Sequence, residues 1–324
     1  MGRVPKSYIQ GTTIELSSRT EEDLPLIATV YMRLILKSYL ARAQELYPVA
    51  LCAVMIMANH FHFIIVVDDP EMVSEFVGYF KRETAHAVNS LLGREKHTVW
   101  AEGFDSPIVL DAAKVVDRLV YFYTNPQRDR IVDTIDEYSQ VNSWSACLSG
   151  GTVLWEVPTF PRPAVPALDF SKKIDAEKVY NTILEGQHGT ARLVIDPFAW
   201  MKCFLETADH SPDAFIREVS KRVRSSEMLF RLEKGTEVLG ADALERQDIR
   251  KRHTPKKWGR RSLCLATLRE HRRDYMVWAK GEAEKARSAI RDWRKKGTRL
   301  ILPPGFYAPG GKLSANIWPT PLFV

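Results

Sequence analysis

His60 and His62 stand in a long apolar run, and their spacing is the first sign of chemistry in this sequence. The run from 49 to 67 is rich in β-branched residues, so we expect strand structure there. Residues two apart on a strand point to the same side. Two neutral imidazoles placed in this way can bind one divalent metal ion. Taken alone, such a pair is more typical of two structural histidines on a half-buried strand.

A tyrosine and an asparagine follow further along the chain at helical spacing. If their segment is a helix, Tyr121 and Asn125 lie one turn apart on one face, whereas Tyr123 points roughly 200° around the helix. A tyrosine beside a metal-binding histidine pair is typical of phosphoryl transfer with a tyrosine nucleophile. Because Asn125 shares the face of Tyr121, we favour Tyr121 over Tyr123 for this role. The alternative for Tyr121 is ordinary packing on an amphipathic helix.

The elements that must position these residues alternate between strand and helix. We predict strands over 12–19, 49–57 and 60–67, with a short strand near 109, and helices over 23–46, 72–92 and 112–124. The two apolar segments beside Ala58 and Asn59 form either a hairpin or one kinked strand. Pro126 is expected to end or kink the third helix. This order predicts an α+β fold, with a small antiparallel sheet flanked by helices.

Length and composition favour a globular protein of about two domains, because the chain has 324 residues and 45% hydrophobic residues. No uninterrupted apolar run reaches the roughly 18 residues of a membrane helix, and the N-terminus lacks a signal-peptide pattern. The 4 cysteines are scattered without a CxxC pair, which argues against zinc fingers and disulfide frameworks. We therefore expect reduced thiols and a cytoplasmic location of bacterial type.

Positive charge is concentrated near the C-terminus. Between Arg246 and Arg299 there are 19 Lys and Arg against 6 Asp and Glu, although the whole chain has a net charge of only +6. Such an asymmetry favours a polyanionic partner, and the interleaved aromatic residues can stack on bases. The alternatives are a solvated helical surface, with the aromatics on the core side of the helices, and an oligomer interface.

A change in composition divides the chain. Gly150 and Gly151 precede a Pro-rich stretch, which predicts an extended linker over 150–170. We therefore expect a catalytic domain over 1–149 and a mostly helical, basic C-terminal region over 171–324. Its predicted helices cover 174–185, 212–232, 263–280 and 282–296, with a basic loop over 253–261 and an irregular tail from 303.

Several blocks, in order, resemble the single-tyrosine transposases of the HUH endonuclease superfamily, specifically the REP-associated tyrosine transposases and their insertion-sequence relatives. The similarity covers about residues 7–145. The blocks are Met57-Ala58-Asn59-His60-Phe61-His62, Phe80-Lys81-Arg82 with Asn89, Val99-Trp100, Tyr121 to Arg128, and Ser143-Trp144-Ser145. Ala58 replaces the usual proline of the first block, and Ala101 replaces a common glutamine. Beyond about Gly150 the resemblance stops.

The resemblance implies an HUH/ferredoxin-like fold and metal-dependent cleavage and rejoining of single-stranded DNA at hairpin-associated sites. His60 and His62 would be ligands of Mg²⁺ or Mn²⁺, and Asn125 would offer a third ligand through its amide oxygen. Tyr121 would be the nucleophile and would form a 5′-phosphotyrosine. Single-stranded or hairpin DNA is then the expected partner, at the nucleoid. Related enzymes occur as monomers and as homodimers, and both remain open.

Basic residues form the last group of candidates. We consider Lys81, Arg82, Arg128, Lys256, Lys257, Arg260 and Arg261 as contacts to nucleic acid, with a solvated surface as the alternative. Two other functions share the same sequence features. One is a domesticated protein that binds nucleic acid without cleaving it, and the other is a replication or mobilisation initiator nuclease of the same superfamily.

Overall fold

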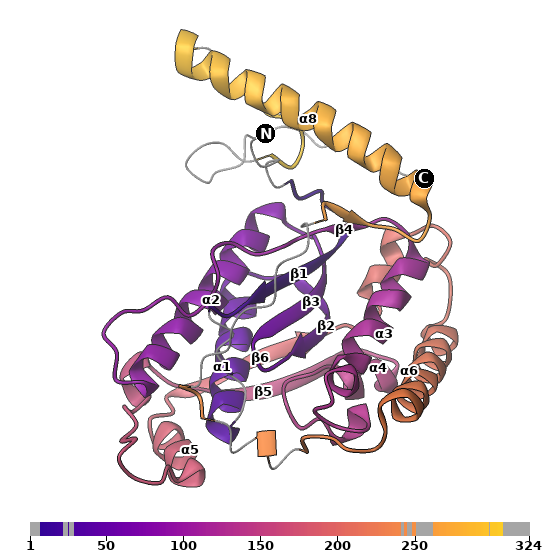
Figure 1. Ribbon diagram of the computed structural model, residues 1–324. Helices are drawn as coiled ribbons and strands as arrows, with labels where there is room; N and C mark the ends of the chain where they lie inside the picture. The colour runs from indigo at the N-terminus through magenta and orange to yellow at the C-terminus, as the bar shows by residue number, and fades with distance from the viewer. Residues whose placement is uncertain are drawn as a thin grey trace.

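A central sheet with the strand order β2-β3-β1-β4-β7 organises the protein (Figure 1). The computed structural model describes residues 7–21, 25, 29–240, 243–244, 248–250, 262–297 and 299–306. The strands are β1 (Thr13–Arg19), β2 (Ala50–Ile56), β3 (His60–Val66), β4 (Ile108–Val109) and β7 (Cys264–Leu265). Neighbours are antiparallel except β4 and β7. The predicted α+β fold is confirmed, and so is the hairpin alternative for β2 and β3.

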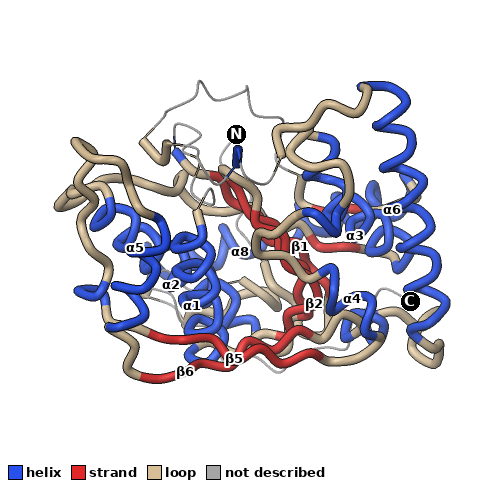
Figure 2. Tube along the Cα trace, turned by 90° about the horizontal axis from the view of Figure 1, so that it is seen from below, coloured by secondary structure: helices blue, strands red, loops and turns tan. Residues whose placement is uncertain are grey.

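Helices cover both faces of the sheet, as Figure 2 shows. One face carries α1 (Val30–Leu46) and α2 (Pro70–Leu91), and the other carries α3 (Ala112–Arg128) with α6 (Pro212–Lys234) beyond it. The alternation along β3 explains this arrangement. Phe61 and Phe63 stack with ring centroids 4.5 Å apart and contact Phe80 of α2. His62 points the other way and contacts Phe122 of α3.

The third helix continues past its proline. Asp111 caps α3, because its side chain accepts a hydrogen bond from the Lys114 amide at 2.7 Å. Of the two alternatives for Pro126, an end of the helix is wrong, because α3 continues to Arg128. A proline removes one N–H donor, but the Asp129 amide still donates to the Asn125 carbonyl at 3.1 Å. The last turn is thereby completed, and Arg128 remains in helical register with Tyr121.

The segment predicted to be a linker carries a strand. Residues Val153–Thr159 form β5, which pairs in antiparallel fashion with β6 (Gly189–Ile195), and α5 (Ala176–Glu185) lies between them in sequence. The proline pattern predicts the extended backbone but not its pairing partner, because paired residues lie 30 to 42 positions apart along the chain. The short helix α4 (Trp144–Ser149) and the pairing of β5 with β6 were not predicted, whereas α5 and α6 were. The division into domains remains a prediction.

Buried apolar residues form one core that continues across residue 150. Leu193 and Ile195 of β6 join the same cluster as Leu40 of α1 and Leu51 of β2. The four cysteines are free, as expected, and Cys203 alone among them is not fully buried. The C-terminal region therefore packs directly against the sheet rather than being held only by a tether.

One long helix replaces the two predicted near the C-terminus. Helix α8 (Arg269–Lys296) has 28 residues and includes Gly281 in its interior. Glycine there costs about 1 kcal/mol relative to alanine. Ala279 and Ala283, on either side of it, are buried and hold the helix together through packing. The predicted basic loop over 253–261 and most of the tail lie outside the described residues. No described helix is long and apolar enough to cross a membrane.

The outer edge of β2 is covered by the chain itself. The Ile56 amide donates to the Val141 carbonyl, and the Ser143 amide donates to the Val54 carbonyl, both at 2.9 Å. The Ser143 hydroxyl also accepts from the Val54 amide at 2.9 Å. These bonds satisfy backbone groups that would otherwise be exposed on an edge strand. Segment 141–143 therefore closes this side of the sheet.

An ion pair ties α2 to the segment after β5, and it gives a pH-dependent prediction. Arg162 donates twice to the buried carboxylate of Glu83, at 2.7 Å in each bond. Burial alone would raise the pKa of Glu83, but hydrogen bonds and charge from Arg162 and Arg82 outweigh it and lower the pKa. Glu83 therefore stabilises the fold fully above its unfolded pKa of about 4.3 and loses this effect as the pH falls through its lower folded pKa.

We expect Glu83→Gln to lower the free energy of unfolding by about 1–2 kcal/mol at pH 7, a modest value because Arg162 is half exposed. The difference from wild type should shrink below about pH 4. Urea unfolding at both pH values measures it. Glu75→Gln, on the exposed side of the same helix, serves as the control. A constant difference at every pH would contradict the ion-pair explanation.

Candidate active site

Strand β3 presents its two histidines to α3. His62 is paired in register with Ser17 of β1, and His60 with Arg19. Their rings lie 5.0 Å apart between centroids, at nearly perpendicular planes. The strand geometry therefore brings both imidazoles to one side of the sheet, as the spacing in sequence predicts.

His62 is oriented by a buried carboxylate. Its Nδ1 lies 2.9 Å from Oε1 of Glu15, which comes from the adjacent strand β1. Arg118 of α3 also donates to both oxygens of Glu15, at 2.5 and 2.7 Å. Burial opposes ionisation of Glu15, yet its contacts with His62 and Arg118 lower its pKa overall. An ionised acceptor at Nδ1 fixes the proton there and leaves Nε2 as the free donor atom for a metal.

His60 is held as a neutral imidazole. Its Nδ1 donates to the side-chain oxygen of Asn59 at 2.7 Å. Burial, followed by the charges of neighbouring His62, Arg19 and Arg128, keeps the pKa of His60 well below its usual value. Its Nε2 accepts from the side-chain amide of Asn125 at 3.3 Å. A neutral ring with an Nε2 lone pair is the form that binds metal ions.

Tyr121 lies against this histidine pair. Its ring centroid is 5.6 Å from that of His62, in an edge-to-face arrangement. The guanidinium groups of Arg118 and Arg128 lie 4.0 and 4.3 Å from the centre of the Tyr121 ring. Residues 118, 121, 125 and 128 are spaced by three, four and three along α3, so all four share one helical face. Two cations therefore flank the phenol of Tyr121.

Asn125 connects α3 to the histidines, and it is the proposed third ligand of the metal ion. The side chain is buried, with its amide nitrogen toward His60 and its oxygen accepting from Arg128. Among the described residues, no group of three His, Cys, Asp or Glu side chains could hold a metal. Two imidazoles and an amide oxygen suit a divalent ion. For the oxygen to bind it, the Asn125 amide must turn over and release Arg128.

The rival tyrosine lies in the core. Tyr123 is fully buried, and its hydroxyl lies 3.0 Å from the Ser143 hydroxyl. Its ring packs on Trp144, with centroids 5.0 Å apart. Burial is the main reason that the pKa of Tyr123 lies well above its usual value. The side chain thus has a packing role, on the other side of α3 from His62.

The predicted basic residues are dispersed. Lys81 donates to the Ala101 carbonyl at 2.8 Å and also to the Gly103 carbonyl, so it fixes a loop. Arg82 contacts Glu83 and the Tyr79 ring. Of the three described members of this set, only Arg128 joins the histidines and Tyr121. The remaining candidates, Lys256, Lys257, Arg260 and Arg261, lie outside the described residues.

Glu15 and Arg118 were missed by sequence reasoning. Arg118 stands three residues before Tyr121, a helical spacing that could have pointed to it. Glu15 lies 47 residues before His62, and only the register of β1 against β3 brings them together. A carboxylate between two apolar residues of a predicted strand was the available signal.

Comparison with known proteins finds a family that resembles the first part of the chain. Residues 23–118 match the model of a family described as Transposase IS200 like. This segment is similar to the IS200-like transposases. The resemblance to tyrosine transposases is thereby confirmed, and a transposase-type function follows for the family. The IS200-like match includes His60 and His62 and ends before Tyr121 and Asn125.

A solved structure is also similar to this chain. It is a REP-associated tyrosine transposase bound to a REP hairpin, with 16% identity and a TM-score of 0.40. The match covers 54% of this chain and 96% of that one. A search among curated proteins finds no match.

Proposed function

We propose that this protein is a metal-dependent, single-stranded DNA endonuclease and strand transferase in which Tyr121 is the nucleophile. The observation that carries the proposal is the position of the Tyr121 ring, 5.6 Å from the His62 ring and between two guanidinium groups. A packing tyrosine would need neither the histidine pair nor the cations. The IS200-like match supports the class of reaction, and hairpin-associated DNA is the proposed substrate.

His60, His62 and Asn125 are the proposed ligands of Mg²⁺ or Mn²⁺. Glu15 would hold His62 with Nε2 toward the ion, and Asn59 would do the same for His60. A divalent ion bound there would polarise the scissile phosphate and neutralise part of its charge. The protein supplies the orientation of these ligands before DNA arrives.

In the proposed reaction the Tyr121 oxygen attacks phosphorus and forms a new O–P bond. The bond from phosphorus to the 3′ oxygen breaks, the phenol loses its proton, and the departing 3′ oxygen gains one. Arg118 and Arg128 lie where they can stabilise the negative charge on the phenol oxygen and on the phosphate. Because the phosphotyrosine retains the phosphodiester linkage, a 3′-OH can attack it in reverse and rejoin DNA without ATP.

The direct test is formation of a covalent complex. We expect the purified protein to give an SDS-resistant adduct with DNA that carries a hairpin next to a single-stranded segment, labelled at the strand 3′ of the cut. The adduct should require Mg²⁺ or Mn²⁺ and disappear with EDTA, and peptide mass spectrometry should place the phosphate on Tyr121. Attachment to another residue would exclude the proposed nucleophile. Binding without cleavage across a panel of such hairpins and both metals would favour the non-cleaving alternative.

A further inference from the structure

Helix α8 carries a row of cations that the proposed chemistry does not use. Successive residues of an α-helix are rotated by about 100° around its axis, and six Lys and Arg side chains of α8 fall within a sector of about 60° of the helix circumference. The cationic stripe consists of Arg269, Arg273, Lys280, Arg287, Arg291 and Arg294. All six are exposed, and the five acidic residues of α8 fall outside the sector, with Glu284 at its border. Over 25 residues, the stripe measures about 37 Å.

An adjacent face of the helix is used for packing. Tyr275, Ala279, Ala283 and Ala286 are buried. Leu302 and Phe306, in the segment that follows the helix, pack on Ala283 and Ala286. The two faces of α8 therefore have different tasks: the apolar one attaches the helix, and the cationic stripe is left to solvent.

Most cations of the stripe have no carboxylate partner within the part of the chain that the structure describes. Among the described residues, Arg269, Lys280, Arg287 and Arg294 make no ion pair, whereas Lys285 and Lys296 outside the sector pair with Glu282 and Asp292. Helical surfaces that only need solubility usually mix charges of both signs at i,i+4 spacing. A one-sign row of this length suits an extended polyanion.

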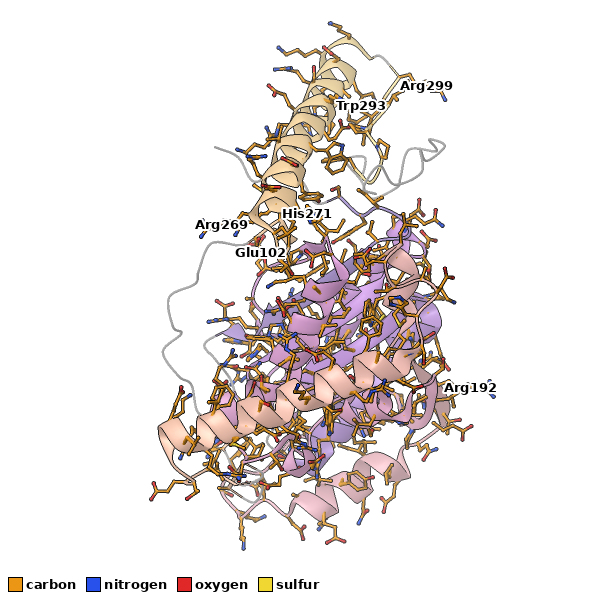
Figure 3. The ribbon with its side chains drawn as sticks, turned by 90° about the vertical axis from the view of Figure 1, so that its right-hand side faces the viewer. Glu102, Arg192, Arg269, His271, Trp293 and Arg299 are labelled. Carbon is orange, nitrogen blue, oxygen red and sulfur yellow. The ribbon has the colours of Figure 1, made fainter. Side chains whose placement is uncertain are left out.

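The base of α8 is tied to the helix that carries Tyr121. Thr267 donates to Asp111 from both its amide and its hydroxyl, at 2.7 Å each, and Asp111 also caps α3. Strand β7, just before α8, pairs with β4 of the central sheet. From this base the helix extends away from the body, and Figure 3 shows Arg269 and His271 near the body and Trp293 towards the far end.

We propose that the cationic stripe of α8 binds the phosphate backbone of duplex DNA, such as a hairpin stem, and holds it in a fixed position relative to Tyr121. This inference rests on the proposed function for the identity of its ligand. A straight row of about 37 Å spans roughly one turn of B-form duplex. Phosphate contacts from arginine and lysine give affinity and position without reading sequence.

The aromatic residues of α8 argue against single-stranded DNA as the ligand. Binding of single strands relies on exposed aromatic rings beside the cations. Tyr275 is buried, and its ring packs on that of half-buried Trp278, with centroids 5.5 Å apart. Trp293 is 39% exposed but lies well outside the sector of the stripe. The stacking suggested by the sequence is therefore not a property of the stripe.

A matched pair of double variants tests the proposal. Lys280→Gln with Arg287→Gln removes two charges from the stripe, and Lys285→Gln with Lys296→Gln removes two charges elsewhere on α8. Fluorescence anisotropy without metal measures the affinity for a 20-base-pair duplex and for a single strand of equal length, at several salt concentrations. These measurements need no cleavage, so they stand even if the protein forms no adduct. Circular dichroism and thermal unfolding confirm that both variants fold.

We expect the stripe variant to lose about tenfold in duplex affinity, with a salt slope smaller by about 1.8, since each lost phosphate contact contributes about 0.9. The control variant should stay within about twofold of wild type. Unchanged duplex binding by the stripe variant would overturn the proposal. Equal losses in the two variants, or a larger loss for the single strand than for the duplex, would overturn it as well.

Discussion

Tyr121→Phe is expected to abolish the covalent DNA adduct, with a loss of at least about a thousandfold in cleavage, while DNA binding remains close to wild type. Phenylalanine keeps the ring that packs between Arg118 and Arg128 and against His62, and it removes only the attacking oxygen. Adduct yield on denaturing gels gives the first quantity. Anisotropy with the same hairpin DNA gives the second.

Tyr123→Phe is the matched control for this result. The Tyr123 hydroxyl bonds in the core to Ser143, so its removal should cost about 1 kcal/mol of stability and leave the adduct intact. If Tyr121→Phe forms adduct at the wild-type rate, Tyr121 has no nucleophilic role. If Tyr123→Phe loses the adduct while remaining folded, the assignment of the two tyrosines must be exchanged.

Glu15→Gln is expected to weaken Mn²⁺ binding by about 10- to 100-fold, although Glu15 is not a proposed ligand. The neutral amide is a weaker acceptor for His62 Nδ1, and it leaves the half-buried Arg118 without its counter-charge. Stability without metal should fall by about 3 kcal/mol, because one partner of a buried ion pair is lost. Isothermal titration with Mn²⁺ at low temperature and urea unfolding in EDTA measure the two effects separately.

Asp117→Asn separates the orienting effect from a general loss of charge. Asp117 is next to Arg118 in sequence, but its carboxylate pairs with Lys114 and Arg222 rather than with the histidines. This variant should bind Mn²⁺ like wild type and lose less than about 1 kcal/mol of stability. The role assigned to Glu15 fails if Glu15→Gln is folded and binds Mn²⁺ with wild-type affinity.

The part of the site that depends on local periodicity could be predicted from sequence. The two-residue period of β3 places His60 beside His62, and the helical period of α3 aligns Tyr121 with Asn125. Glu15 could not be found in this way, because its contact with His62 requires the pairing of strands 47 residues apart. The same limit applies to β5 and β6, whose pairing spans the whole of α5.

Predictions of where elements end failed where packing overrides local propensity. Pro126 and Gly281 each suggest a break, yet α3 and α8 continue through them. In α8 the buried alanines on either side of Gly281 supply the packing that propensity alone does not. The basic composition after residue 246 draws attention to this helix, but only the fold separates its packed side from its cationic stripe.

The covered margin of β2 limits how two copies of this protein can associate. A second molecule cannot extend the sheet by adding a strand alongside β2, because Val141 and Ser143 already occupy the Ile56 and Val54 hydrogen-bonding positions. At the opposite margin, β7 offers only the two residues Cys264 and Leu265. A homodimer, if it forms on DNA, must therefore leave the β2 margin of the central sheet unchanged and use other surfaces of the molecule.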